Sequence, residues 1–526
     1  MNIQLEKAKD DNITCKLEDE NGKWKYIYSK YKPKDITLPE IKIDKGYIIL
    51  GLGLGYEVNF IAKNTHKKIY VIEPSKEFYN IISENQELEE VLTNPNIIFL
   101  FEEEYKTVNF ENQCEIINNK NITKFNNNYY VEVLQHLQSK VMKKNKPVIV
   151  MFEHVTIAAD CRDALENIGY KVEMLKFNFN FNAEETSMNI ANKYADYVMS
   201  INFNPTLSEV CNSMNIPYIC WCVDTPQYGL YKKQVLNKVN FIFTYENSVV
   251  DELKKVGVRN IYYMPVAANI KRFDSLIVNQ EDIKDYSCDV NFIGNLTISE
   301  YVRDIKDYLS NETKNKINHL IDLQHKDINH FVLKKMCTKE LVEIIEKEAN
   351  YYLGGLDYFS DVATLALLLG REQSFQERIA IINAISKQFN KYDVRVYGND
   401  LWNNYINNYC GSAEHFTVMP KIMKLSKINL NITRTFVESG LPMRIFDVLG
   451  SKGFLLTNYK KGLEYKLSAG KDFVVYRDLK DLLQIIDYYL NHEEKRIEIA
   501  NHGYETAKKY HTYEIRVKEI MDIVNR

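Results

Sequence analysis

The chain has 526 residues, too many for one ordinary hydrophobic core, and its length predicts about three domains. Its 45% hydrophobic and 26% charged residues are typical of a globular protein. No apolar run approaches the roughly 18 residues that a membrane span needs, so we expect no integral membrane segment. The net charge of −4 excludes a positive field for non-specific nucleic-acid binding. The polar first residues carry no signal-peptide core, which predicts a cytoplasmic location.

Nine cysteines at irregular spacing argue against a disulfide framework. The close pair Cys220 and Cys222 has no second pair beside it to complete a zinc site. We therefore expect buried free thiols.

Strand and helix patterns alternate in the first part of the chain. Residues 1–45 are polar, with short strand-like pieces. The predicted order is then a strand in "GYIILGLG", a helix in "YEVNFIAKN", a strand in "KKIYVIEPS", a helix in "EFYNIISENQELEEVL" and a strand in "NIIFLFEEE". This order is typical of a parallel sheet, so residues 1–145 are predicted to form a Rossmann-like domain.

Three glycines, Gly51, Gly53 and Gly55, follow the first strand of this domain, and Glu73 ends the second. Glycines after a strand let a ligand approach the backbone, and an acid at the end of the next strand can bind ribose hydroxyls. The four residues are therefore candidate ligand-binding residues, with tight strand–helix packing as the alternative. The turn "GLGLGY" is closer to the first motif of S-adenosylmethionine methyltransferases than to G-x-G-x-x-G. It also resembles the turn in motility-accessory flagellin-modification proteins, which implies an accessory domain.

A second α/β unit is predicted over 146–285. Its strands are "PVIVMFEHV", "KVEMLKF", "ADYVMSIN", "IPYICWCVD", "NFIFTYE" and "IYYMP", with a helix in "DCRDALENIGY". Phe177, Phe179 and Phe181 alternate in "KFNFNFN" and are expected on one strand face, in the core. Two strand ends place Glu153, His154 and Asp224 at one edge of the sheet. Each is a candidate general base, with loop hydrogen bonding as the alternative role.

A third unit is predicted over 286–526. It opens with the strand "CDVNFIGN" and continues with a helical pattern over about 299–390. The strands "DVRVYGN", "KINLNIT", "GFLLTN" and "DFVVY" and three final helices complete it. Thr512 is predicted as the N-cap of the last helix, with Glu514 in its first turn.

The segment 428–458, "INLNITRTFVESGLPMRIFDVLGSKGFLLTN", carries the clearest local signal for a binding site. A strand is followed by a glycine-containing loop, and Pro442 can occupy the first turn of the next helix. The backbone N–H groups from Gly440 through Leu441 to Arg444 are predicted to face an anion there, where the helix dipole favours a diphosphate.

Two side chains of that helix can complete such a site. Arg444 offers a charged fork for phosphate, and Asp447 can accept hydrogen bonds from ribose hydroxyls. An Arg444–Asp447 pair at positions i and i+3 is the alternative.

Together, the motifs of residues 150–520 resemble the family of the spore-maturation protein CgeB and related bacterial glycosyltransferases of the GT-B class. The motifs are "YICWCVDTP", "MPVAANIKRF", "CDVNFIGN", "VRVYGND", "KINLNITR", "MRIFDVLGSKGFLLTN" and "YHTYEIR". The resemblance implies an α/β GT-B fold of two facing Rossmann-like lobes. Residues 146–285 would form the acceptor lobe. Residues 286–526 would form the nucleotide-sugar lobe with its helical insertion, and residues 1–145 an extra Rossmann-like domain.

The resemblance also implies donor-binding residues at the strand ends of the nucleotide-sugar lobe. These are Gly294, Asn295, Arg303, Tyr397, Gly398, Thr433, Arg434, Glu438, Gly440, Leu441, Arg444 and Asp447. Asp447 matches the ribose-binding acid of retaining GT-B enzymes. Glu438 lies one position too far from Asp447 to match the partner acid, which leaves retention or inversion of stereochemistry open.

The sequence thus predicts a metal-independent glycosyltransferase that needs no cofactor beyond its nucleotide-sugar donor. The donor is expected to be UDP-linked, and the acceptor a hydroxyl of a protein or surface glycan, with flagellin as the specific candidate. No D-x-D pair follows a suitable strand, and helix N-termini with basic residues can stabilise a leaving diphosphate. The alternatives are an S-adenosylmethionine-dependent glycan methyltransferase acting through the N-terminal domain, and a non-catalytic binding scaffold.

Overall fold

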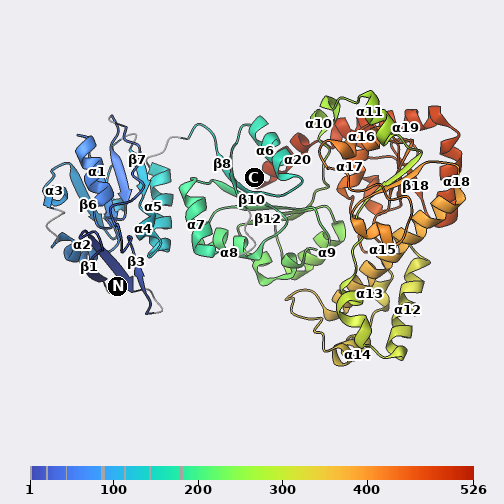
Figure 1. Cartoon of the computed structure of the whole chain (residues 1–526), viewed down its shortest axis with the longest axis horizontal. Helices are drawn as coiled ribbons and strands as arrows, with labels where there is room; N and C mark the ends of the chain where they lie inside the picture. Colours follow the sequence, from blue (N-terminus) through green and yellow to red (C-terminus); the bar gives the residue numbers. More distant parts are fainter. Residues whose placement is uncertain are drawn as a thin grey trace. The chain divides into compact units, whose positions relative to one another are not determined.

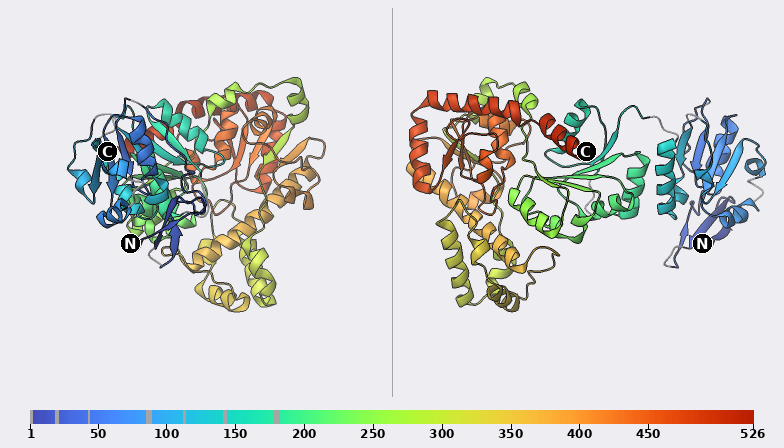
Figure 2. Two further views of the ribbon diagram at one scale, coloured as in Figure 1. Left: turned by 60° about the vertical axis from the view of Figure 1, so that its left-hand side comes forward. Right: turned by 180° about the vertical axis from the view of Figure 1, so that it is seen from behind.

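A computed structural model of the chain describes residues 3–18, 22–42, 44–84, 89–111, 114–140, 144–176 and 182–526. It divides into two compact units. The first comprises Met1–Val150, Asn178–Asp196 and Ser213–Ile216, and the second Met151–Phe177, Tyr197–Asn212 and Pro217–Arg526. Figure 1 shows the elements in sequence colours, and Figure 2 shows them from two further directions. The predicted strand face of Phe177, Phe179 and Phe181 lies outside the described residues.

The first unit contains two sheets. A small antiparallel sheet has the order β1 (Ile3–Lys7), β2 (Ile13–Glu18), β3 (Trp24–Tyr26). A parallel sheet has the order β6 (Ile97–Phe101), β5 (Ile69–Glu73), β4 (Tyr47–Leu50), β7 (Glu115–Asn118). Every residue of β4 and β5 is buried, as expected for central parallel strands. The strand β7 is an addition to the predicted elements.

Helices cover the parallel sheet of the first unit. They are α1 (Tyr56–Asn64), α2 (Lys76–Ser83), α3 (Glu89–Leu92), α4 (Lys120–Thr123), α5 (Asn127–Lys140) and α7 (Ala183–Asn192). The helix α1 has the predicted bounds. Within the long helix predicted after β5, the described residues form α2 and α3.

The other elements form two lobes, which belong to the second unit apart from Val148–Val150 of β8 and Ser213 of α8. The first lobe has a six-stranded sheet in the order β13 (Ile261–Tyr263), β12 (Asn240–Thr244), β11 (Tyr218–Cys222), β10 (Tyr197–Ile201), β8 (Val148–Phe152), β9 (Lys171–Leu175). The pairs from β10 to β13 are parallel. The helices of this lobe are α6 (Ala158–Asn167), α8 (Pro205–Ser213) and α9 (Asn247–Val256), followed by α10 (Ile270–Ser275) and α11 (Gln280–Tyr286).

The second lobe has a five-stranded, wholly parallel sheet in the order β15 (Val394–Tyr397), β14 (Val290–Ile293), β16 (Ile428–Asn431), β17 (Leu455–Asn458), β18 (Val474–Tyr476). The chain leaves β14 for β15 on one side and then returns to β16 on the other. The strand order therefore reverses between β14 and β16, and ligands of open α/β sheets bind beyond the carboxyl ends of strands at such a point.

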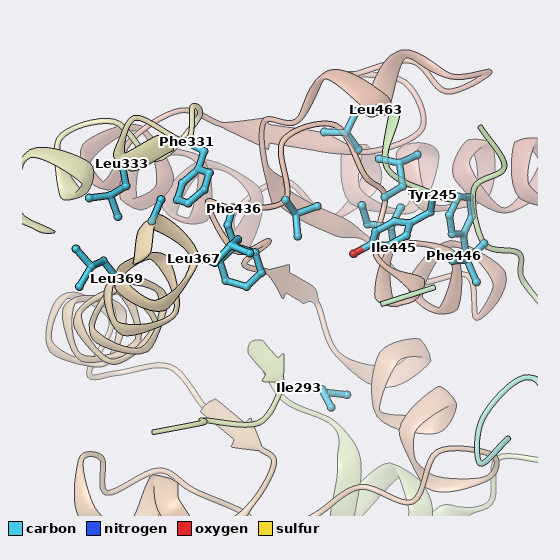
Figure 3. Close-up of a cluster of buried hydrophobic side chains, with 14 of the residues drawn as sticks. Tyr245, Ile293, Phe331, Leu333, Leu367, Leu369, Phe436, Ile445, Phe446 and Leu463 are labelled. Atoms are coloured by element: carbon cyan, nitrogen blue, oxygen red, sulfur yellow. The ribbon is translucent and has the colours of Figure 1, made fainter. Parts of the chain in front are cut away.

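A helical insertion separates β14 from β15. It contains the irregular turns Tyr301–Ile305 and Lys306–Tyr308 and then α12 (Asn311–His325), α13 (Leu333–Met336), α14 (Lys339–Ala349) and α15 (Asp361–Gln388). Figure 3 shows Phe331 and Leu367 of this insertion beside Phe436, in a core that also includes Tyr245 of the first lobe. The insertion thus shares one hydrophobic core with both lobes.

The helices α16 (Val418–Leu425), α17 (Met443–Gly450), α18 (Leu479–Leu490), α19 (Glu493–Tyr510) and α20 (Tyr513–Val524) complete the second lobe. The Thr512 hydroxyl accepts from the backbone N–H of Ile515, so the predicted N-cap of α20 is confirmed. Beyond it the chain returns to the first lobe, where α20 packs on α6 (Figure 1) and Asn525 bonds Tyr170 and Tyr197.

The prediction of an α/β chain with parallel sheets in several Rossmann-like lobes is confirmed. Among the described residues, no helix combines the length and the apolar character needed to cross a membrane.

Candidate functional site

A pocket of about 210 Å³ lies at the carboxyl ends of β14 and β16, where the strand order of the second lobe reverses. Asn295 follows β14, Arg434 follows β16, and Arg371 and Arg378 reach the pocket from α15. The remaining lining residues are Leu296, Thr297, Ser374 and Phe375. Three guanidinium groups around one pocket suit an anionic ligand such as a diphosphate.

The guanidinium of Arg378 joins the two strand ends at this pocket. One Nη donates to the carbonyl of Asn295 at 2.8 Å and the other to the carbonyl of Ile432 at 3.2 Å. Its Nε is buried and has no hydrogen-bond partner among the described residues. The residue thus holds the rim of the pocket while keeping donor capacity unused.

The arginines of the pocket repel one another. Burial lowers the pKa of Arg378 to about 9, and the charge of Arg434 adds to this effect. Burial also lowers the pKa of Arg434, as does the charge of Arg371. Arg371 is paired with Glu300, whereas no acid within the described ranges forms an ion pair with Arg434. A bound anion would relieve this repulsion.

Several predicted donor residues pack against protein here. A Cβ at Gly398 would collide with the carbonyl of Gly294, which accepts from the Trp402 indole at 2.8 Å. Tyr397 and Thr433 are almost fully buried, and Thr433 donates its N–H to the Asn458 side chain at 2.8 Å. These residues shape the strand ends rather than present free groups.

Arg303 lies away from the pocket in the described structure. Its side chain is 62% exposed and pairs with the adjacent Asp304 at 2.6 Å. Of the predicted donor-binding residues at the strand ends, Asn295 and Arg434 line the pocket, whereas Arg303 does not.

The loop before α17 departs from its predicted environment. The N–H groups of Ser439 and Gly440 do not face open space, because both donate to the carboxylate of Glu246, at 2.7 and 3.1 Å. Leu441 is wholly buried in the core. Pro442 stands at the N-cap position and α17 begins at Met443.

Arg444 and Asp447 form the i, i+3 pair that was the alternative prediction, with Nη1 and Oδ2 separated by 3.6 Å. Asp447 is 4% exposed, and its Oδ2 has no hydrogen-bond partner among the described residues. Burial raises its pKa to about 6, with the charges of Arg444 and Arg272 acting in the opposite direction. The carboxylate therefore retains acceptor capacity that the protein does not use.

A narrow pocket of about 50 Å³ lies between the two lobes and the insertion. Asp224, Thr244 and Glu246 line it from the first lobe, Phe359 and Leu367 from the insertion, and Phe436 and Glu438 from the second lobe. Of the three predicted bases, Asp224 reaches this pocket, and its Oδ2 accepts from Asn202 at 2.7 Å.

The other two candidate bases lie at the end of β8. Glu153 is exposed, and its N–H donates to the carbonyl of Leu175 at 2.9 Å. His154 is half-buried with Nδ1 3.3 Å from the Thr156 hydroxyl. Burial lowers the pKa of His154, and the Asp224 carboxylate acts in the opposite direction. His154 and Asp224 are therefore close enough to interact electrostatically.

Polar contacts join the lobes and the insertion around this pocket. Lys334 of α13 donates to Glu252 of α9 at 2.6 Å and to Glu438 of the loop before α17 at 2.8 Å. Lys232 donates to the carbonyl of Gly355 at 2.6 Å. The insertion thus connects the two lobes beside the interlobe pocket.

The glycines of the first unit favour the packing alternative. A Cβ at Gly51 would collide with Ile122, and a Cβ at Gly53 with the Tyr28 hydroxyl. All three glycines have positive φ, between 55° and 86°. Side chains therefore lie against the Cβ positions of Gly51 and Gly53, as tight packing requires.

Glu73 faces the same turn and is 2% exposed. It accepts the N–H of Leu52 at 3.0 Å, and burial raises its pKa to about 7. Its predicted ligand role therefore competes with a structural one.

Arg371 and Arg378 are functional candidates that sequence reasoning missed, because the insertion was read as helical packing. Their spacing of seven residues puts both on one face of a helix, and that signal was available. Glu246, Glu252 and Lys334 carried no sequence signal, since their partners lie far along the chain. No group of three or more His, Cys, Asp or Glu side chains in the described part of the chain could hold a metal ion.

Comparison with known proteins gives one family match and a set of distant structures. Residues 376–522 match a family model described as "Glycosyl transferase-like". No curated protein matches the chain.

A glycosyltransferase from Rickettsia africae is 12% identical, with a TM-score of 0.42 over 73% of this chain and 98% of its own. Anabaena Alr3699/HepE, solved with UDP-glucose, is 11% identical, with a TM-score of 0.41 over 72% of this chain and 99% of its own. WaaG, a glycosyltransferase of lipopolysaccharide biosynthesis, is 8% identical, with a TM-score of 0.38 over 72% and 99%. The segment 376–522 of the second lobe is therefore similar to glycosyl transferase-like proteins.

Proposed function

We propose that the chain is a glycosyltransferase that moves a sugar from a nucleoside-diphosphate sugar to an acceptor hydroxyl. The observation that carries this proposal is the pocket lined by Arg371, Arg378 and Arg434 at the strand-order reversal of the second lobe. A diphosphate there would meet three guanidinium groups at the edge where open α/β sheets bind nucleotides. The family match of residues 376–522 supports the same reaction class.

The transfer breaks the bond between the sugar C1 and the oxygen of the donor diphosphate and forms a bond from C1 to the acceptor oxygen. Negative charge develops on the leaving diphosphate, and the three arginines would stabilise it without a metal ion. Asp447 would accept hydrogen bonds from the ribose hydroxyls, for which its Oδ2, paired with Arg444 at 3.6 Å, has no hydrogen-bond partner among the described residues. A uridine nucleotide is the proposed carrier of the sugar, as expected in the sequence analysis.

The acceptor would enter between the lobes, where Asp224 and Glu438 line the interlobe pocket. Asp224 is the first candidate to take the acceptor proton, with His154 and Glu153 at the same sheet edge. A protein or surface glycan is the proposed acceptor class, with flagellin as the specific candidate. Residues 1–145 would then be an accessory domain that helps to recognise the acceptor.

Asp447→Asn tests the donor assignment without an identified acceptor. The substitution keeps the volume of a buried side chain and removes the charge that the ribose hydroxyls would meet. We expect the release of UDP from UDP-glucose or UDP-N-acetylglucosamine, with water as acceptor, to fall at least about 100-fold in single-turnover assays.

The double variant Gly53→Val with Glu73→Ala is the control for methyl transfer. Under the proposed function it keeps sugar release in any sample that remains folded. Normal sugar release by Asp447→Asn would remove Asp447 from the donor site. Loss of a methyltransferase activity only in the double variant would support the alternative function.

A further inference from the structure

The carboxylate of Glu246 occupies the N–H group of Gly440, which the sequence assigns to the donor diphosphate, and that of the adjacent Ser439. Its Oε1 accepts the N–H of Ser439 at 2.7 Å, and its Oε2 accepts the N–H of Gly440 at 3.1 Å. The hydroxyls of Ser439 and Ser248 donate to the same carboxylate. Glu246 is 1% exposed, so its carboxylate is buried and accepts hydrogen bonds from four donors.

The chain is built to bring this carboxylate to the loop. Glu246 follows β12 of the first lobe, and the adjacent N–H of Asn247 donates to the Ser439 hydroxyl at 2.9 Å. A Cβ at Gly440 would collide with the ring of Tyr245, so glycine is required for the close approach. On the other side, a Cβ at Gly462 would strike the carbonyl of Ser439. The loop is therefore fixed from both sides with its N–H groups turned to the carboxylate.

We propose that Ser439 and Gly440 form an anion site that Glu246 holds in the empty enzyme and yields to one phosphate group of the donor diphosphate, whose other phosphate group meets the arginine pocket. The inference rests on the proposed function, because it takes the donor to be a nucleoside diphosphate. Two anions cannot share the same pair of N–H donors, so the donor must displace the carboxylate. Glu246 is thus an internal competitor of the donor.

The displaced carboxylate would remain beside the acceptor. Glu246 lines the interlobe pocket together with Asp224 and Glu438. The lobes would stay joined, because Lys334 still bridges Glu252 and Glu438, and Lys232 still reaches Gly355. Donor binding would therefore exchange one interlobe contact without separating the lobes.

The test compares three variants of the full chain by calorimetric titration with UDP and with uridine. Glu246→Gln keeps the size of the side chain and removes its charge, and Glu246→Ala removes both. Either should bind UDP about tenfold more tightly than the unmodified chain, since one charge-assisted contact no longer competes. Affinity for uridine, which has no diphosphate, should not change.

Glu252→Gln is the matched control. It weakens another interlobe carboxylate contact, to Lys334, and leaves the N–H groups of Ser439 and Gly440 occupied. Its UDP affinity should stay within about twofold of the unmodified chain. An equal gain of UDP affinity in Glu252→Gln would mean that weakening any interlobe contact is enough to tighten UDP binding. That result would overturn the proposed displacement of Glu246 by the donor. Unchanged or weaker UDP binding by both Glu246 variants overturns it as well.

Hydrogen–deuterium exchange of the peptide containing Ser439 and Gly440 separates this inference from the proposed function. These amides should exchange slowly in the unmodified chain and faster in Glu246→Ala, with no nucleotide present. Equal exchange overturns the inference whatever the ligand result. If the amides behave as expected but no form of the chain binds UDP or GDP, the proposed donor is wrong. The proposed displacement of Glu246 by that donor is then overturned as well.

Discussion

Arg434→Ala should weaken UDP binding about 100-fold, because two charge-assisted hydrogen bonds of about 1.5 kcal/mol each would be lost. Arg434 follows β16, lines the pocket at the strand-order reversal and forms no ion pair with any acid in the described ranges. Its pKa is lowered by burial and by the charge of Arg371. Removing it should therefore leave the stability of the empty protein unchanged or slightly higher. Calorimetric titration with UDP and thermal unfolding without ligand measure the two effects.

Arg303→Ala is the matched control for this prediction. It removes the same charge from the same lobe, but at an exposed side chain that is paired with Asp304. Its effect on UDP affinity should be less than about twofold. If both variants weaken binding equally, only the net charge of the lobe matters. If Arg303→Ala alone weakens binding, the donor lies where the sequence placed Arg303 and not in the arginine pocket.

Glu377→Gln should stabilise the second unit at pH 8 and have little effect at pH 5. Glu377 lies on α15, is 4% exposed, and neither carboxylate oxygen has a hydrogen-bond partner among the described residues. Burial raises its pKa from 4.5 to about 7, while the nearby Gln373 amide and the charge of Lys460 act to lower it. The protonated carboxyl is fully tolerated below pH 4.5. The free energy of unfolding then falls as the pH rises through 7, because the folded state must hold a buried charge on Glu377.

The expected gain at pH 8 is up to about 3 kcal/mol in the free energy of unfolding, from a pKa difference of about 2.5. Denaturant titrations at pH 5 and pH 8 measure it. Glu372→Gln on the same helix is the control with the opposite sign, since Glu372 accepts from Ser299 at 2.6 Å and Gln376 at 2.7 Å. It should lose stability at both pH values. Destabilisation by Glu377→Gln at pH 8 would show that its charge is paired.

The strands and helices that sequence predicted best are those whose pattern is complete within a few residues. The helix α1 and the strands β4 and β5 are examples, because their apolar spacing and the adjacent glycines act locally. The strand β7 was missed because its four residues are half-buried and lie beside an asparagine-rich stretch.

The surroundings of two glycine-containing loops depend on contacts with residues far away in the sequence, which the local sequence pattern does not predict. The turn at Gly51 and Gly53 predicted either a ligand or tight packing, and Ile122 and Tyr28 from distant elements lie against the Cβ positions of the two glycines, as tight packing requires. The loop at Gly440 predicted an anion and has one, but the anion is Glu246, which lies far upstream in the chain. No reading of the loop alone could supply that partner.

The central claim, a nucleoside-diphosphate donor in the second lobe, is tested most directly by one titration series on the full chain. UDP, GDP and S-adenosylmethionine are titrated separately by calorimetry into the unmodified chain and into Arg434→Ala. We expect one UDP to bind per chain, with affinity lost in Arg434→Ala, and no binding of S-adenosylmethionine. Binding of S-adenosylmethionine alone, or UDP binding that Arg434→Ala leaves intact, would contradict it.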